Sequence, residues 1–288
     1  MVTKRTLLEL MLRFTEALTH NNPSEIPMTK DCIATYQGVK AEVGSGEIWG
    51  DLRRIPYRQT FVDPITRTAC FTGVVTNNVN FKVLPKDRAR LAFGPQKWWI
   101  YYVRITANEA GEICEIEEIA RPDTSSGLNV TPAQMQPPRI LEAPLPEDEK
   151  STREEMLRIG SLYWDANAKM VDSSLVPIHP DARRIEVGTP VSDEFNHPNS
   201  VRTQYDLPNF FWEVTKRRYP VVDVDRGILI STAHMIARSP EEPTGYVTDI
   251  FKIECGMIKY IYAFHDWNIE YVAWEGVGPQ STEEMDKA

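Results

Sequence analysis

The sequence predicts an α+β protein built from two diverged tandem copies of one unit, each a curved antiparallel sheet wrapped on a long helix to form a small cone. Three observations support this fold class. The chain has 288 residues, which suits two domains of average size. An amphipathic helix is expected near the start of each half. Short sequence matches then recur in the same order in both halves, which indicates an internal duplication.

Each copy begins with apolar residues spaced three and four apart, the period of a helix with one buried face. These residues include Leu7, Met11, Phe14 and Leu18 in the first copy and Met156, Ile159, Tyr163 and Ala166 in the second. Residues 152–155 form a capping box before the second helix.

Three matches follow the helices. Residues 24–31 match 174–181, residues 61–63 match 221–223, and residues 111–116 match 256–261. The last pair contains a glycine turn between two β-rich runs. We therefore expect a short strand after each long helix, then one or two short helices and three long antiparallel strands. One of the short helices is expected at residues 206–218.

The copies are expected at residues 1–120 and 151–278. Between them, residues 121–150 contain six prolines, which remove backbone donors, so this segment is expected to be an extended linker without strands. Residues 279–288 form a polar tail.

Composition excludes several classes of partner. The net charge of −9 disfavours nucleic acid, because the phosphate backbone repels an acidic protein. No apolar run approaches the roughly 20 residues of a membrane-spanning helix. The four cysteines are scattered, and no leader segment is recognisable, so a cytoplasmic protein with reduced thiols is expected.

The order of elements resembles the nuclear-transport-factor-two-like superfamily, which includes ketosteroid isomerase, scytalone dehydratase and SnoaL-like polyketide cyclases. Residues 217–227, Arg-Arg-Tyr-Pro-Val-Val-Asp-Val-Asp-Arg-Gly, are similar to a stretch in tandem proteins of this superfamily. The resemblance implies two cystatin-like α+β cones, each around a pocket, and a place in secondary metabolism. It also implies that the two sheets pair as an internal pseudo-dimer, and it leaves a further homodimer open.

The resemblance extends to the short strand after the first helix, with a departure. Relatives often carry a Glu-Asn pair there. The second copy keeps Glu186 but continues with Val187, and the first copy has Tyr36-Gln37.

No phosphate-binding loop, nucleophile elbow or zinc motif is present, so chemistry without a cofactor or metal is the leading enzymatic option. Four of the five histidines lie in the second copy. His234 and His265 fall late in long strands and are the proton-transfer candidates, since neutral imidazole suits proton transfer near neutral pH. Asp249 or Glu186 would orient an imidazole or act as the base.

Aromatic residues would provide a dry lining for a hydrophobic substrate. The candidates are Phe210, Phe211, Trp212 and Phe251 in the second copy and Tyr36 and Trp49 in the first. If the histidines face away from the pocket, the first copy, around Tyr36, Trp49 and Tyr57, becomes the leading site.

The expected function is that of a cofactor-independent lyase, isomerase or cyclase. It would act by general acid–base catalysis on a small hydrophobic molecule, with aromatic or polyketide-like compounds among the options. The alternative is a non-catalytic small-molecule-binding or scaffold protein, in which hydrogen bonds or water satisfy the histidines.

Overall fold

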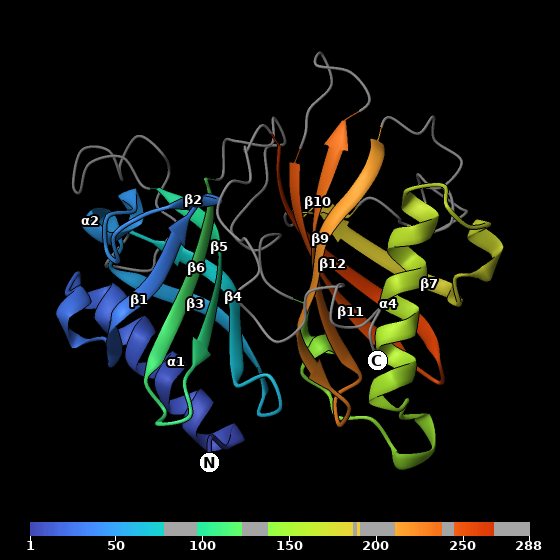
Figure 1. Cartoon of the computed structure of the whole chain (residues 1–288), viewed down its shortest axis with the longest axis horizontal. Helices are drawn as coiled ribbons and strands as arrows, with labels where there is room; N and C mark the ends of the chain where they lie inside the picture. The colour runs from blue at the N-terminus through green and yellow to red at the C-terminus, as the bar shows by residue number, and fades with distance from the viewer. Residues whose placement is uncertain (78–96, 123–137, 187–188, 191–210, 238–244, 268–288) are drawn as a thin grey trace. The chain divides into compact units, whose positions relative to one another are not determined.

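The computed structural model describes residues 1–77, 97–122, 138–186, 189–190, 211–237 and 245–267. The chain divides into two compact units, Met1–Pro137 and Pro138–Ala288 (Figure 1). Each unit has one long helix and a mixed six-stranded sheet, so the predicted α+β class is confirmed.

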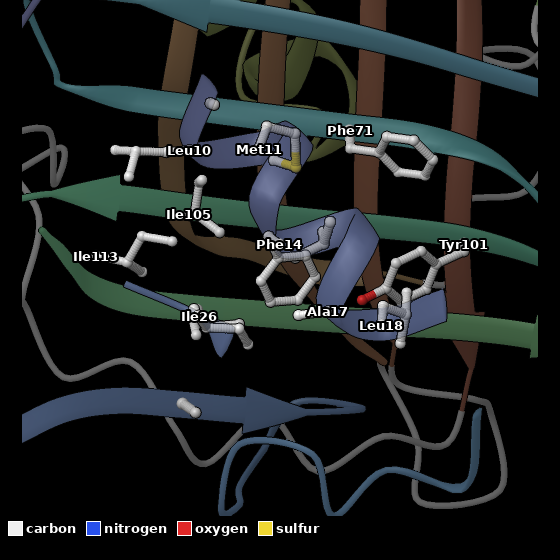
Figure 2. Packing of buried hydrophobic residues seen from close by; sticks show 14 of the residues in the cluster. Leu10, Met11, Phe14, Ala17, Leu18, Ile26, Phe71, Tyr101, Ile105 and Ile113 are labelled. Atoms are coloured by element: carbon white, nitrogen blue, oxygen red, sulfur yellow. The ribbon is translucent and has the colours of Figure 1, made fainter. Parts of the chain in front are cut away.

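In unit 1, helix α1 spans Lys4–His20 and packs its apolar face on the sheet. It begins at Thr3, whose side chain accepts from the backbone of Thr6 in a capping box, and ends at Asn21 in the left-handed conformation. Figure 2 shows Phe14 and Leu18 of this helix beside Tyr101 of the sheet.

The unit 1 sheet has the strand order β2-β1-β6-β5-β4-β3. Its strands are β1 (Met28–Tyr36), β2 (Val39–Lys40), β3 (Arg54–Asp63), β4 (Thr68–Thr76), β5 (Trp98–Ala107) and β6 (Ile113–Pro122). Strand β1 runs parallel to β6, and the other pairs are antiparallel. The short helices η1 (Pro23–Glu25) and α2 (Glu47–Asp51) flank β1 and β2 in the chain.

Unit 2 repeats this plan, with the strand order β8-β7-β12-β11-β10-β9. Its elements are α4 (Arg153–Asn167), η4 (Ser173–Leu175), β7 (Ile178–Glu186), β8 (Thr189–Pro190), β9 (Phe211–Asp223), β10 (Ile228–Ala237), β11 (Gly245–Glu254) and β12 (Met257–Trp267). Strand β7 runs parallel to β12, as β1 does to β6. Over the described residues, the two units therefore share the succession of a long helix, a short helix and six strands, and one order of strands in the sheet.

The prediction of a helix at residues 206–218 is wrong over the described residues, because strand β9 begins at Phe211. Lys216 has φ 49°, and the register of β9 against β10 shifts beside it, the signature of a β-bulge. Across the bulge the buried residues are Val214, Arg217 and Tyr219, and the spacing of three between the first two imitates that of a helix.

The segment before α4 belongs to unit 2. It contains the short helices η2 (Arg139–Leu141) and η3 (Glu147–Glu149), and Leu145 is buried. Nζ of Lys252 donates to the carbonyl of Ala143 at 2.6 Å, which ties the segment to β11. At the other end of the expected linker, residues 121–122 complete β6 instead of leaving the sheet.

None of the helices in the described part of the chain combines the length and apolar character needed to cross a membrane.

Candidate functional site

A buried carboxyl group, that of Glu118 on β6, is the centre of the candidate site in unit 1. Side chains alternate along a strand, so Glu118 shares a face with Ile116 and Ala120. Both neighbours belong to the core under α1. Glu118 therefore points to the helix-covered side of the sheet, where it is 3% exposed.

Two neutral donors hold this carboxyl group. The hydroxyl of Tyr101 on β5 donates to Oε2 of Glu118 at 2.5 Å. The indole Nε1 of Trp49 on α2 lies 3.0 Å from Oε2 and 3.2 Å from Oε1. Burial raises the pKa of Glu118 to about 7, although the hydrogen bonds from Tyr101 and Trp49 oppose this rise. Glu118 can therefore both accept and donate a proton near neutral pH.

Tyr36 brings a third polar group to this region. It lies directly opposite Glu118 in the register of β1 and β6. Its hydroxyl oxygen is buried and has no hydrogen-bond partner among the described residues. Burial, with smaller contributions from Glu47 and Glu118, raises the pKa of Tyr36, so the hydroxyl keeps its proton at neutral pH and can donate it in a hydrogen bond.

Gly46 makes room for the ring of Tyr36. A Cβ atom at position 46 would lie 2.5 Å from that ring, which is too close for any other residue without a shift. The glycine therefore fixes how Tyr36 packs beneath the start of α2.

Aromatic rings surround the carboxyl group. Phe14 of α1 packs edge-on against Trp49 with ring centroids 5.7 Å apart. Phe71 of β4 packs against Tyr101 at 6.0 Å. Among the described residues, Glu118 therefore lies with aromatic rings and with the hydrogen-bonding side chains of Tyr36, Trp49 and Tyr101.

Unit 2 places a different group on the helix-covered side of its sheet. Arg184 of β7 donates to Oε1 of Glu186 at 2.6 Å and to the hydroxyl of Tyr163 on α4 at 2.5 Å. It also forms a 3.7 Å ion pair with the fully buried Asp249 of β11. Burial opposes the charge of Arg184, but Tyr163, Asp249 and Glu186 together hold its pKa well above the usual range. The two predicted carboxylates thus converge on an arginine.

His234 does not converge with them. In the register of β10 and β11, Ser231 lies opposite Asp249 and His234 lies opposite Tyr246. Ser231 accepts a hydrogen bond from Trp164 of α4, so the face of Ser231 and Asp249 is the one under the helix. His234 projects from the other face, where burial, and then Lys216, lower its pKa.

The remaining predicted residues are placed in part. Phe251 lies under α4, 4.8 Å from the ring of Tyr163. His265 lies opposite Val247 in the register of β11 and β12. The structure gives the backbone, but not the side chains, of Phe211, Trp212 and His265, and Phe210 lies outside the described residues.

No metal site is formed in the part of the chain that the structure describes: no three His, Cys, Asp or Glu residues there are grouped to hold an ion.

The raised pKa of Glu118 predicts a pH-dependent stability. The unfolded chain loses this proton near pH 4.5 and the folded chain near pH 7, so the folded state binds more protons in between. The free energy of unfolding should therefore fall as pH rises across this window and then level off. Relative to Glu118→Gln, the fall should be on the order of 3 kcal/mol. Urea titrations from pH 4.5 to 8 measure it.

The control for this comparison is Glu109→Gln, at a side chain that is 92% exposed. If the difference between Glu118→Gln and the wild type stays constant with pH, the burial of Glu118 does not affect the pKa of its carboxyl group.

Comparisons with known proteins give a partial view. The family described as a domain of unknown function (DUF8021) matches residues 149–265, which lie within unit 2. No curated protein matches the chain. A solved structure titled as AclR, a putative hydroxylase from Streptomyces galilaeus, is 13% identical, with 41% of this chain and 81% of that chain covered and a TM-score of 0.30. A de novo designed protein with a curved β-sheet is 15% identical, with 43% and 94% covered and a TM-score of 0.33.

Proposed function

We propose that this chain is a cofactor-independent acid–base enzyme of the lyase, isomerase or cyclase type, and that Glu118 in unit 1 is its proton-transfer group. One observation carries the proposal: burial raises the pKa of the Glu118 carboxyl group to about 7, while the uncharged side chains of Tyr101 and Trp49 donate hydrogen bonds to it. General acid–base catalysis is most efficient when the catalytic pKa lies near the working pH.

The proposed reaction begins with proton removal from a carbon next to a carbonyl group. The carboxylate of Glu118 takes this proton, and the C–H electron pair moves into the carbonyl to form an enolate. The hydroxyl of Tyr36 donates a hydrogen bond to the enolate oxygen, where negative charge develops. The protonated Glu118 then returns the proton to another carbon, which completes an isomerisation, or to a leaving hydroxyl group, which completes the elimination of water.

Trp49 and Tyr101 would hold the carboxyl group during both proton transfers. Their hydrogen bonds favour the ionised form, and burial favours the neutral form, so the two effects together keep both forms accessible. The aromatic rings that pack on Trp49 and Tyr101 favour a small hydrophobic substrate over a polar one. The resemblance to the nuclear-transport-factor-two-like superfamily, with its cystatin-like cones, supports the same class of reaction.

This proposal moves the site from the second copy to the first. In unit 2, Asp249 and Glu186 both form ion pairs with Arg184, which engages the two predicted carboxylates with one cation. This arrangement favours the alternative function, binding or scaffolding without catalysis, for unit 2 alone.

The proposal is tested by hydrogen–deuterium exchange at carbon. A panel of small alicyclic and aromatic ketones is incubated in D₂O with the wild type, and loss of the proton signals next to the carbonyl is followed by NMR. We expect exchange with at least one ketone, and a loss of roughly 10²- to 10³-fold in Tyr36→Phe, because one donor to the developing oxyanion is removed. Tyr102→Phe, on the opposite face of β5, is the matched control and should retain the wild-type rate. Absence of exchange across the panel would instead favour a binding protein.

A further inference from the structure

Glu118 is enclosed, so a ligand can reach it only if part of unit 1 moves. Glu118 and Trp49 are each 3% exposed, and Tyr101 is completely buried. The site described above is therefore closed in this structure. Among the described residues, the long elements around it are the strands β1, β5 and β6 and the helix α1. Helix α2 also covers it and has only five residues.

On its buried side, α2 contacts the carboxyl group of Glu118 directly. Trp49 donates to the carboxyl group of Glu118, as given above, and Ile48 and Leu52 are fully buried beside it. Among these contacts, the bond from Trp49 is the polar one, so any outward movement of α2 must first remove a hydrogen bond from Glu118.

The outer side of α2 makes an exposed ion pair and a partly buried hydrogen bond. Asp51 forms the ion pair with Lys97, and the two side chains are 42% and 51% exposed. Glu47 accepts the hydrogen bond, at 3.3 Å, from Nε1 of the buried Trp99. An exposed ion pair contributes about 0–1 kcal/mol, so the pair of Asp51 and Lys97 holds α2 only weakly.

Three glycines lie in or just before α2. The helix begins at Gly46, which has no side chain to cap it. Gly44 has φ +86°, a conformation that other residues rarely adopt, and no atom lies within 4 Å of where a Cβ of Gly50 would be. Glycine lowers helix stability and permits large changes in φ and ψ, which is what a hinge requires.

We propose that α2 is the movable cover of the Glu118 site, that ligands enter by its displacement, and that the exposure of Glu118 to water on opening couples this displacement to the protonation of the carboxyl group. The inference rests on the proposed function only for the chemical class of the ligand that enters the site. The coupling itself belongs to the free protein and can be measured without a substrate.

The direction of the coupling follows from the groups around Glu118. In the closed site, the strands around the carboxyl group of Glu118 provide two tyrosines, Tyr36 of β1 and Tyr101 of β5. The helices provide Trp49 and Glu47 of α2 and the apolar Phe14 of α1. No cation among the described residues offsets the charge, so burial dominates and the closed state prefers the protonated acid. Once α2 opens, water solvates the carboxylate and its pKa returns towards the ordinary 4.5.

Opening should therefore become more favourable as pH rises from about 4.5 to about 7, and should be independent of pH above that. At low pH both states carry the proton, so the coupling contributes nothing there. Between pH 5 and pH 8 the opening constant should rise roughly 10- to 100-fold.

The experiment is amide hydrogen exchange of α2 in the free, full-length protein, followed by mass spectrometry of peptides that cover residues 44–53 or by NMR. The reporters are the amides of Trp49 and Leu52, which are bonded to the carbonyls of Gly46 and Ile48. Rates are divided by the intrinsic exchange rate at each pH, which leaves the opening constant. In the wild type this constant should rise with pH as stated. In Glu118→Gln, which cannot ionise, it should stay flat.

A second variant tests the ion pair of Asp51 and Lys97. Lys97→Met should raise the opening constant about two- to fivefold at every pH and leave its pH dependence unchanged. The matched control is Arg5→Met, which removes the exposed ion pair with Glu9 on α1 and should not affect α2.

Three outcomes would overturn the proposal. The opening constant of the wild type could be flat with pH, it could rise equally in Glu118→Gln, or Lys97→Met could behave as Arg5→Met does. None of these readouts uses a substrate, so they do not decide the ketone-exchange test of the catalytic proposal. Failure of the ketone-exchange test, in turn, would not contradict the movement of α2.

Discussion

Replacing Glu118 with glutamine is expected to lower the rate of ketone proton exchange by roughly 10²- to 10⁴-fold, the usual loss when a general acid or base is removed. Glutamine preserves the size of the side chain and can still accept the hydrogen bonds of Trp49 and Tyr101, but it cannot carry the proton. The wild-type rate is expected to rise as pH increases through about 7, because the base is the ionised Glu118, and the residual activity of the variant should lack this rise.

Asp249→Asn is the matched control, because Asp249, like Glu118, is a buried acid on the helix-covered face of its own sheet. It should leave the exchange rate within about threefold of the wild type if catalysis belongs to unit 1. The reverse result, with Asp249→Asn inactive and Glu118→Gln unaffected, would return the site to unit 2.

The second large effect is on stability. Arg184→Met is expected to lower the free energy of unfolding by about 3–5 kcal/mol, because it leaves the buried carboxylate of Asp249 without its cation. Methionine keeps much of the volume of the side chain, so most of the loss would be electrostatic. Urea titration followed by circular dichroism measures it.

Two further variants separate charge from packing. Asp249→Asn in the Arg184→Met background should recover most of the lost stability, since the unpaired charge is then gone. Arg183→Met, at the exposed neighbouring position of β7, should change stability by less than about 0.5 kcal/mol. If the double variant is no more stable than Arg184→Met, the ion pair is not what holds this region.

The long helices could be predicted because their spacing and capping residues are local signals. Thr3 and Thr152 cap α1 and α4, and each helix buries the apolar face that its sequence displays. Strand β9 could not be predicted in the same way. Its bulge at Lys216 breaks the alternation of buried and exposed side chains on which recognition of a strand depends.

The candidate site was predicted in part. Alternation shows that Thr232 and His234 share a face of their strand, and that Asp249 and Phe251 share a face of theirs. It does not say which face the helix covers, and that depends on the pairing of β10 with β11. His234 was therefore a reasonable candidate from the sequence, and only the register separates it from Asp249.

Glu118 was missed because it stands in an acidic run, Glu115-Ile116-Glu117-Glu118, that is typical of a solvent-exposed strand. A signal was present nonetheless. Ile116 and Ala120 have the same parity as Glu118, so a strand that buries them must also bury the carboxyl group. Its partners, Trp49 and Tyr101, come from parts of the chain far apart in sequence, and no local pattern joins them.

The most direct test of the role of Glu118 is the titration of its carboxyl group by NMR, in protein labelled with ¹³C at the glutamate side-chain carboxyl and assigned by the signal that disappears in Glu118→Gln. The ionisation midpoint should lie near pH 7. A midpoint near 4.5, the ordinary value for glutamate, would show that this carboxyl group is not adapted for proton transfer and would contradict the proposed function.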